Sequence, residues 1–424
     1  MRLAVIAGAV FLVIGAATTL LVAQRSDAFN EQLSHPAIGY LTQPTRDAVA
    51  RLNEDLRRGT TRLTFDPRHG YLRSVLAAAH IPVESQLLVF SQTSAQGEQV
   101  SMANPRALFF ADDIAVGWVR GTELLEVAVV DPEQGPIFYT LEQKPADTPQ
   151  FKRDDSCLLC HDIWETHGVP GLQVLSTYPM ADERAYASGA VTDHRTLFTD
   201  RWGGWFVTGQ SVPPYHLGNQ PVVRSTSRAP IPAPVLPSVE GQFDLSGYPA
   251  RTSDVVALMV FEHQTYVTNL ITWLGWEARV AAVALARDAP EAHDRIAVVA
   301  RELVDAMLFV GEPQLARPLA GNSGFAELFP ARGVKDRQGR SLRELDLQHQ
   351  LFKYRCSYMI ESNEFDSLPV VARRAVYSRL WQILSGAETA PDYRSLTKAD
   401  RQAVAEILRD TRHDLPQEFG VVTR

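Results

Sequence analysis

Residues Cys157 to His161 read Cys-Leu-Leu-Cys-His, the residues in this chain whose types and spacing best suit chemistry. Two thiols three residues apart, followed directly by an imidazole, form the attachment signature of a c-type haem. In that signature the thiols bond the porphyrin and the histidine binds the iron. Attachment fixes the neighbours of His161, so the imidazole is held at the iron at little entropic cost. The motif predicts one covalently attached haem c, bound by Cys157, Cys160 and His161, that handles electrons, oxygen or peroxide.

Two other kinds of site use a Cys-x-x-Cys pair, and the rest of the chain favours neither. A structural zinc site needs four ligands, but Cys356 is the only further cysteine and no second Cys or His pair has ligand spacing. A redox dithiol is expected in a thioredoxin-like context, which the residues flanking the motif do not suggest. We interpret Cys356 as a buried structural thiol. The attachment motif occurs once, so a mono-haem protein is predicted.

The N-terminus predicts the compartment. Residues 3–23 are an apolar run without charge that follows Arg2. The run is just long enough to span a bilayer, which takes about 20 apolar residues. A cleaved signal peptide usually has a shorter apolar core and a small-x-small cleavage site, and Leu21-Val22-Ala23 is a poor one. We expect residues 1–24 to be a membrane anchor, with a cleaved signal peptide as the alternative. Both place the remaining chain on the periplasmic side of the bacterial inner membrane.

Composition limits the possible partners. The formal charge of −8 is spread along the chain, and no basic stripe of the kind that binds nucleic acid is present. A hydrophobic fraction of 45% is enough for a substantial core. The roughly 400 exported residues suggest two domains or one large one.

Hydrophobic patterning predicts an α+β fold. Residues 28–145 should form an α/β part with a small antiparallel sheet, because short aliphatic and aromatic runs alternate with turn residues. The expected strands are 61–65, 85–90, 107–110, 115–119, 124–130 and 136–141, with a helix at 46–58. Residues 146–250 are the predicted haem-binding segment, which is irregular because seven prolines between Pro213 and Pro237 exclude helix. An interdomain linker is the alternative interpretation of that segment.

Residues 251–424 are predicted to be mainly helical. The run 254–286 is apolar on nearly all sides, which indicates a helix buried inside the fold. Further helices are expected at 293–310, at 342–361 and around 377–384, where Gly386 is a natural stop. A capping box at Thr397 and Asp400 predicts the start of the last helix.

The role of the iron depends on the ligand opposite the attached histidine. A Met or His there is typical of an electron carrier, whereas an open position is typical of an enzyme or sensor. The first candidate is His216, which lies in the irregular segment and could fold over the ring. Met180 on the same segment is an alternative, as is His263, which shares one helix face with Met259. His194 stands among charged residues and is equally typical of a structural hydrogen-bonding residue.

Other residues are predicted to surround the ring. Arg195 and Arg201 can pair with haem propionates, because a guanidinium binds a carboxylate through two hydrogen bonds. Trp164, Trp202 and Trp205 are candidate packing partners of the porphyrin. Ordinary core packing is the alternative for the tryptophans.

Several motifs resemble those of a large, uncharacterised family of exported bacterial mono-haem cytochrome c domain proteins. The similar strings are Asp193-His194-Arg195-Thr196, 201–209, 216–219, 257–264 and 357–369, within most of residues 60–385. Those relatives carry one Cys-x-x-Cys-His at a similar point, and a Met often follows the His of their His-x-Gly-Asn motif. This chain has Leu217 there, so if that Met is the family's ligand, His216 or an open site is favoured. The resemblance implies haem c and export, and it implies no reaction.

Together these features predict an exported mono-haem cytochrome that transfers single electrons at the periplasmic face, with His161 and His216 on the iron. Its partner would be a redox protein or a small-molecule electron donor or acceptor, and its N-terminal helix would bind the membrane. One alternative is a haem enzyme of peroxidase or oxidase type with an open sixth position. There His194, Arg195 and Glu262 could supply the acid, base and cation. A haem-based sensor module is a further alternative.

Overall fold

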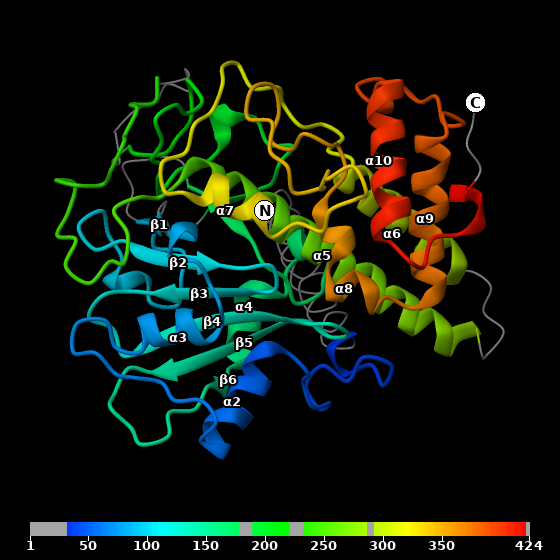
Figure 1. The fold of residues 1–424 in the computed structure, drawn as a ribbon. Coiled ribbons are helices and arrows are strands. Elements are labelled where there is room, and N and C mark those ends of the chain that lie inside the picture. The colour runs from blue at the N-terminus through cyan, green and yellow to red at the C-terminus, as the bar shows by residue number, and fades with distance from the viewer. Residues whose placement is uncertain (1–31, 178–188, 221–231, 286–291, 421–424) are drawn as a thin grey trace, which may run out of the picture.

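The computed structural model describes residues 32–177, 189–220, 232–285 and 292–420. An antiparallel sheet fills the N-terminal half and helices dominate the C-terminal half (Figure 1), which confirms the predicted α+β class. The expected anchor at 1–24 lies outside the described residues. Within the described ranges, no helix has the length and apolar character needed to cross a membrane.

The sheet has seven antiparallel strands in the order β6-β5-β4-β3-β2-β1-β9. The strands are β1 (Leu87–Val89), β2 (Arg106–Phe110), β3 (Ile114–Trp118), β4 (Leu124–Asp131), β5 (Gly135–Glu142), β6 (Lys152–Arg153) and β9 (Trp205–Phe206). Five of these confirm predicted strands. The strand predicted at 61–65 is wrong: its Thr64 N–H donates to Ser74 Oγ at 2.8 Å, and the segment joins no ladder.

The helices differ in length and position. Two short ones, α2 (Ala48–Arg58) and α3 (Leu72–Ala78), precede the sheet, and α4 (Leu158–His161) is a single turn. The C-terminal half contains α5 (Val255–Leu285), α6 (Ala292–Met307), α7 (Phe325–Ala331), α8 (Asn363–Asp366), α9 (Val370–Leu384) and α10 (Lys398–Thr411). Helices α6, α9 and α10 group beside α5 at one side of the molecule (Figure 1). The capping box that opens α10 is confirmed.

The helix predicted at 342–361 is wrong. Within this stretch the chain folds back on itself, and an isolated bridge pairs Leu345 with Phe352. Lys353 N–H donates to Glu344 O at 2.8 Å, which closes the loop. Only a 3-10 turn at Tyr358–Glu361 is helical. Apolar residues therefore face the core here without helical periodicity.

The two faces of the sheet bury separate cores. One face, which includes Leu88 and Phe109, packs against α2 and α3. The other face, which includes Val89 and Phe110, packs against α5 and the helices behind it. Alternate strand residues point to opposite faces, so one sheet serves both cores.

Helix α5 organises the second core. Its Phe261 ring packs on Phe110 of β2 with centroids 4.8 Å apart, and its Trp276 Nε1–H donates to Gln134 O at the β4–β5 turn. The helix therefore crosses the sheet, and its predicted burial on nearly all sides is confirmed. Because its surroundings are apolar, each polar side chain on it needs a specific partner.

The described part of residues 146–250 has only short elements. Besides β6, α4 and β9 it contains a two-stranded ribbon of β7 (Val174–Ser176) and β8 (Ala190–Thr192). Trp202 and Val207 join the core around α5. The segment therefore packs with the parts before and after it. The division at 145 and 250 stays a prediction.

Candidate haem-binding site

The Cys-x-x-Cys-His motif forms a short helical turn directly after the edge strand β6. A 3-10 turn at Asp155–Cys157 runs into α4, and Asp154 caps it by accepting a hydrogen bond from Ser156 N–H at 3.1 Å. Residues three apart on a helical turn share a face. Cys157 is half-buried, Cys160 is exposed, and neither is in a disulfide. Two free thiols at the surface on one face suit attachment to a single porphyrin edge.

The His161 ring is held by a strand and by a backbone carbonyl. It packs on Phe138 of β5 with ring centroids 4.6 Å apart, and its Nδ1 lies 2.8 Å from Gly171 O. A carbonyl can only accept, so Nδ1 carries the proton and donates. In the neutral ring this leaves Nε2 with a free lone pair, the arrangement common in metal-binding histidines. Within the described ranges Nε2 has no hydrogen-bond partner.

A single side chain on α5 fixes the carbonyl that orients His161. Asn269 Oδ1 accepts from Leu172 N–H at 2.8 Å, and its Nδ2 donates to Leu172 O at 2.7 Å. Gly171 N–H in turn donates to His161 O at 2.7 Å. A Cβ at Gly171 would lie 2.8 Å from Asn269 Oδ1 and 2.7 Å from Thr166 Cβ, so only glycine fits without displacement. Asn269 thus positions His161 through the 171–172 backbone.

The motif lies near a charged pair on the sheet. Arg106 of β2 pairs with Glu126 of β4 at 2.5 Å, and the arginine covers Gly117 between them. Burial, Asp154 and Glu126 raise the pKa of the Cys157 thiol to about 11, so the free thiol is protonated at neutral pH. Burial and the Arg106 charge lower the pKa of His161. A neutral imidazole is the form that binds metal.

The structure places His216 at the other edge of the sheet. Its ring lies edge-on to the ring of Trp202, with ring centroids 5.2 Å apart, and Trp202 stands three residues before β9. His161 packs on β5, and β5 and β9 are separated by four strands, which amounts to about 24 Å at the usual strand spacing. The two imidazoles are therefore not brought together.

The hydrogen bonding of His216 also differs from that of an iron ligand. Gly218 N–H donates to His216 Nδ1 at 3.0 Å, so in the neutral ring the proton sits on Nε2. That nitrogen is buried without a hydrogen-bond partner in the described part of the chain. Burial lowers the pKa of His216 to about 3, with a smaller contribution from Arg317. His216 as the sixth ligand stays a prediction that this geometry does not support.

The other candidate ligands are placed in the core or outside the described ranges. His263 is fully buried, with Nε2 2.7 Å from Ser357 Oγ and Nδ1 3.2 Å from His194 Nδ1. Met259 belongs to the apolar core around α5. Met180 lies outside the described residues. His194 keeps one unpartnered nitrogen, because its Nε2 is buried without a hydrogen-bond partner in the described part of the chain.

Arg201 and Glu262 form a fully buried ion pair beside the two core histidines. Arg201 Nη1 lies 3.2 Å from Glu262 Oε2, and the two side chains are 1% and 0% exposed. Arg201 Nη2 donates to His194 O, and Thr192 Oγ1 donates to Glu262 Oε1. The proposed peroxidase residues His194 and Glu262 are thus gathered around Arg201. These contacts do not favour Arg201 as a propionate partner, because its guanidinium has no exposed surface.

The remaining predicted ring neighbours take several positions. Arg195 pairs with Asp193 at 2.7 Å and lies 4.4 Å over the Tyr266 ring. Trp202 is fully buried, whereas Trp164, three residues after the motif, is 68% exposed. Trp205 donates its indole N–H to Leu175 O at 2.7 Å. Packing of these rings on haem stays a prediction.

Sequence reasoning missed the residues that orient His161. Gly171 and Asn269 lie 98 residues apart, so no local pattern links them. The usable signal is that Asn269 is one of several polar residues on a helix buried on nearly all sides, where each polar side chain needs a partner. Phe138 and Arg106 read as ordinary strand residues.

Comparison with known proteins adds no relative, because no family model, curated protein or solved structure matches this chain.

Proposed function

We propose that this chain is a mono-haem c-type cytochrome. Cys157 and Cys160 would hold the haem through thioether bonds, and His161 Nε2 would bind the iron. The hydrogen bond from His161 Nδ1 to Gly171 O carries the proposal, because it selects the tautomer that ligation requires. When bound, haem c supplies a one-electron Fe(III)/Fe(II) couple.

The surrounding residues support electron transfer at the surface. Leu159, between the two cysteines, is 85% exposed, and Cys160 is exposed as well, so a redox partner can approach the motif directly. Phe138 and the Gly171 carbonyl hold the imidazole of His161, so an electron transfer would require little reorganisation of the protein around it. We propose one-electron transfer at the periplasmic face, with the N-terminal segment as membrane anchor. A redox protein or a small-molecule donor or acceptor would be the partner.

A second function is supported by the placement of the candidate ligands. His216 stands at the far edge of the sheet and His263 has partners on both nitrogens. Among the predicted ligands this leaves Met180, Met259 and His194, whose Nε2 has no hydrogen-bond partner in the described part of the chain, or an open sixth position. An open position would support a haem enzyme of peroxidase or oxidase type, or a sensor.

Low-temperature EPR and optical spectra of the ferric protein, produced with the haem-maturation machinery, separate these functions. A low-spin spectrum with the far-red sulfur-to-iron band supports a carrier with Met180 or Met259 as ligand. A high-spin spectrum, with fast cyanide binding at neutral pH, supports the open site. A low-spin spectrum without that band means two imidazole ligands. If His216→Gln then became high-spin, the placement of His216 described above would be contradicted, and if it stayed low-spin, His194 would be the second ligand.

A further inference from the structure

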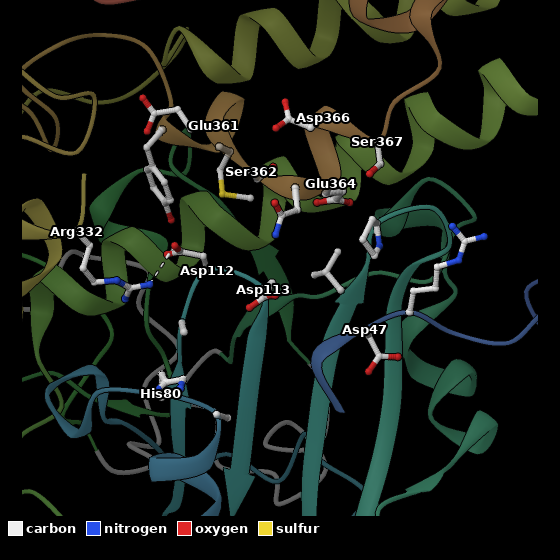
Figure 2. Close-up of a pocket in the computed structure, with 18 of the residues that line it drawn as sticks. Asp47, His80, Asp112, Asp113, Arg332, Glu361, Ser362, Glu364, Asp366 and Ser367 are labelled. Carbon is white, nitrogen blue, oxygen red and sulfur yellow. Dashed lines mark ion pairs between the residues drawn. The ribbon is translucent and has the colours of Figure 1, made fainter. Parts of the chain in front are cut away.

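A cavity of about 590 Å³ opens at one end of the sheet, remote in sequence from the haem motif (Figure 2). Its walls come from the start of α2, the end of α3, the β2–β3 and β4–β5 turns, and residues 358–367. Small-molecule sites typically measure about 300–1,000 Å³. No residue of the Cys-x-x-Cys-His motif lines it, so it is separate from the site described above.

The arginines on one wall are paired with a single carboxylate. Arg332 and Arg343 place Nη2 atoms 3.0 and 2.6 Å from Asp112 Oδ2, and the first pair is drawn in Figure 2. Arg343 also lies 4.3 Å over the Tyr358 ring. Both of these cations are therefore held at Asp112. Two further arginines line the cavity: Arg46 pairs with Glu133, and Arg51 donates to Arg46 O while its charge opposes the rise in the pKa of Asp113 that burial causes.

Four further carboxyl groups line the cavity and form no ion pair within the described part of the chain: Asp47, Asp113, Glu361 and Glu364. Asp47 is already held by hydrogen bonds from Ala50 N–H and Tyr139 O–H. Glu361 Oε1 is buried and has no hydrogen-bond partner there. Glu364 is 6% exposed, and its carboxyl is held by Thr272 Oγ1, which donates at 2.8 Å. Burying a carboxylate without a cation costs free energy. A cation in the cavity would remove that cost.

Burial favours the protonated form of these carboxyl groups. Burial raises the pKa of Glu361 to about 7 and that of Glu364 to about 8. Burial and the Asp112 charge also raise the pKa of Asp113. Arg343, Arg412, Asp112, Arg279 and Asp113 are the charged groups that act on the two glutamates. These carboxyl groups would release protons as a cation binds.

We infer that this cavity binds a small alkylamine that carries at least two ammonium groups. The ammonium groups pair with Asp113, Glu361 and Glu364. The carbon chain between them packs on apolar lining residues, among them Val130 and Pro132. The inference does not depend on haem attachment, and its failure would leave the proposed function standing.

Isothermal titration of the full-length holoprotein with 1,4-diaminobutane tests this inference. We expect saturable binding at pH 8.5 and affinity at least tenfold weaker at pH 6, where the two glutamates are protonated, because each pKa unit is a tenfold change. 1,4-Butanediol, with the same chain and no charge, should not bind. Absence of diamine binding, equal binding of the diol, or tighter binding of Mg²⁺ would overturn the inference.

Matched variants distinguish diamine binding in the cavity from general electrostatic attraction of a cation to an acidic protein. Glu361→Gln and Glu364→Gln keep side-chain size, and each should weaken diamine binding at least tenfold. Glu327→Gln removes the same charge from the exposed surface of α7, outside the cavity, and should bind as the parent does. Circular dichroism checks that each variant is folded. Equal losses in all three, or no loss in the two cavity variants, would contradict the inference.

Discussion

His161 and His216 are both histidines held by backbone groups, yet the two regions prepare opposite nitrogens. A carbonyl at His161 accepts from Nδ1 and frees Nε2, whereas an N–H at His216 donates to Nδ1 and puts the proton on Nε2. His161 follows a half-buried and an exposed cysteine, whereas His216 is buried and packs against Trp202. The backbone partner of Nδ1 therefore tells more about ligation than the presence of a histidine in a loop does.

Removing the covalent attachment should have the largest effect. In Cys157→Ser with Cys160→Ser no covalent haem remains, because no other thiol adjoins His161. The pyridine haemochrome assay on acid-acetone-extracted protein measures it. Cys356→Ala is the control, since that thiol is buried in the core around α5 and should not affect attachment. Loss of haem in the control, or retention in the double variant, would contradict the assignment of the motif.

Replacing His216 should change the stability of the fold at acid pH and leave the ligation of the iron unchanged. Its pKa is lowered, so the folded state prefers the neutral ring. The stability from this preference is complete above the unfolded pKa near 6.5 and is lost as pH falls towards 3. The full difference is on the order of 5 kcal/mol. Urea unfolding between pH 7 and 4 should show a shallower loss in His216→Gln than in the parent.

The EPR spectrum of His216→Gln sharpens the same comparison. The spin state should match that of the parent, because the ring stands at the far edge of the sheet. A change from low spin to high spin would show that His216 is a ligand after all.

Asn269 and Gln264 provide a matched pair on α5. Asn269→Ala leaves the half-buried Leu172 N–H and C=O without their partner, which should lower the free energy of unfolding by about 2 kcal/mol. It should also shift the haem midpoint potential, because the Gly171 carbonyl loses its support. Gln264→Ala removes comparable hydrogen bonds to Ala111 O and from Tyr358.

Gln264→Ala should therefore cost similar stability without changing the potential. Redox titration and chemical denaturation measure the two quantities. Equal potentials in the two variants would refute the positioning role of Asn269.

Gly171→Ala should give a stability loss similar to that of Asn269→Ala and a specific spectral change. A Cβ within 2.8 Å of Asn269 Oδ1 must displace the amide or the backbone, at a cost of about 1–3 kcal/mol. Displacement lengthens the His161 hydrogen bond, which resonance Raman detects in the iron–histidine region. An unchanged spectrum would mean that the carbonyl does not control His161.

The sequence predicted those elements whose formation depends on contacts between neighbouring segments of the chain. The strands from 85 to 141 were found because each apolar run pairs with a neighbour along the chain. The runs 61–65 and 342–361 have suitable composition, but one lacks a partner strand and the other folds back on itself.

Within the site, the motif itself was readable because its two cysteines and its histidine lie within five consecutive residues. The tautomer of His161 was not, because it depends on contacts between Gly171 and a helix about a hundred residues later. His216 was predicted as a ligand because it lies in the irregular segment, which could fold over the ring. The sequence contains no information on which nitrogen its backbone neighbour occupies.

Intact-mass spectrometry of the denatured protein, produced with haem-maturation machinery, tests the central claim most directly. The account predicts a mass increase of one haem per chain, retained under denaturing conditions and mapped to the peptide that contains Cys157 and Cys160. A chain with the unmodified mass, under conditions that mature a known c-type cytochrome, would contradict it.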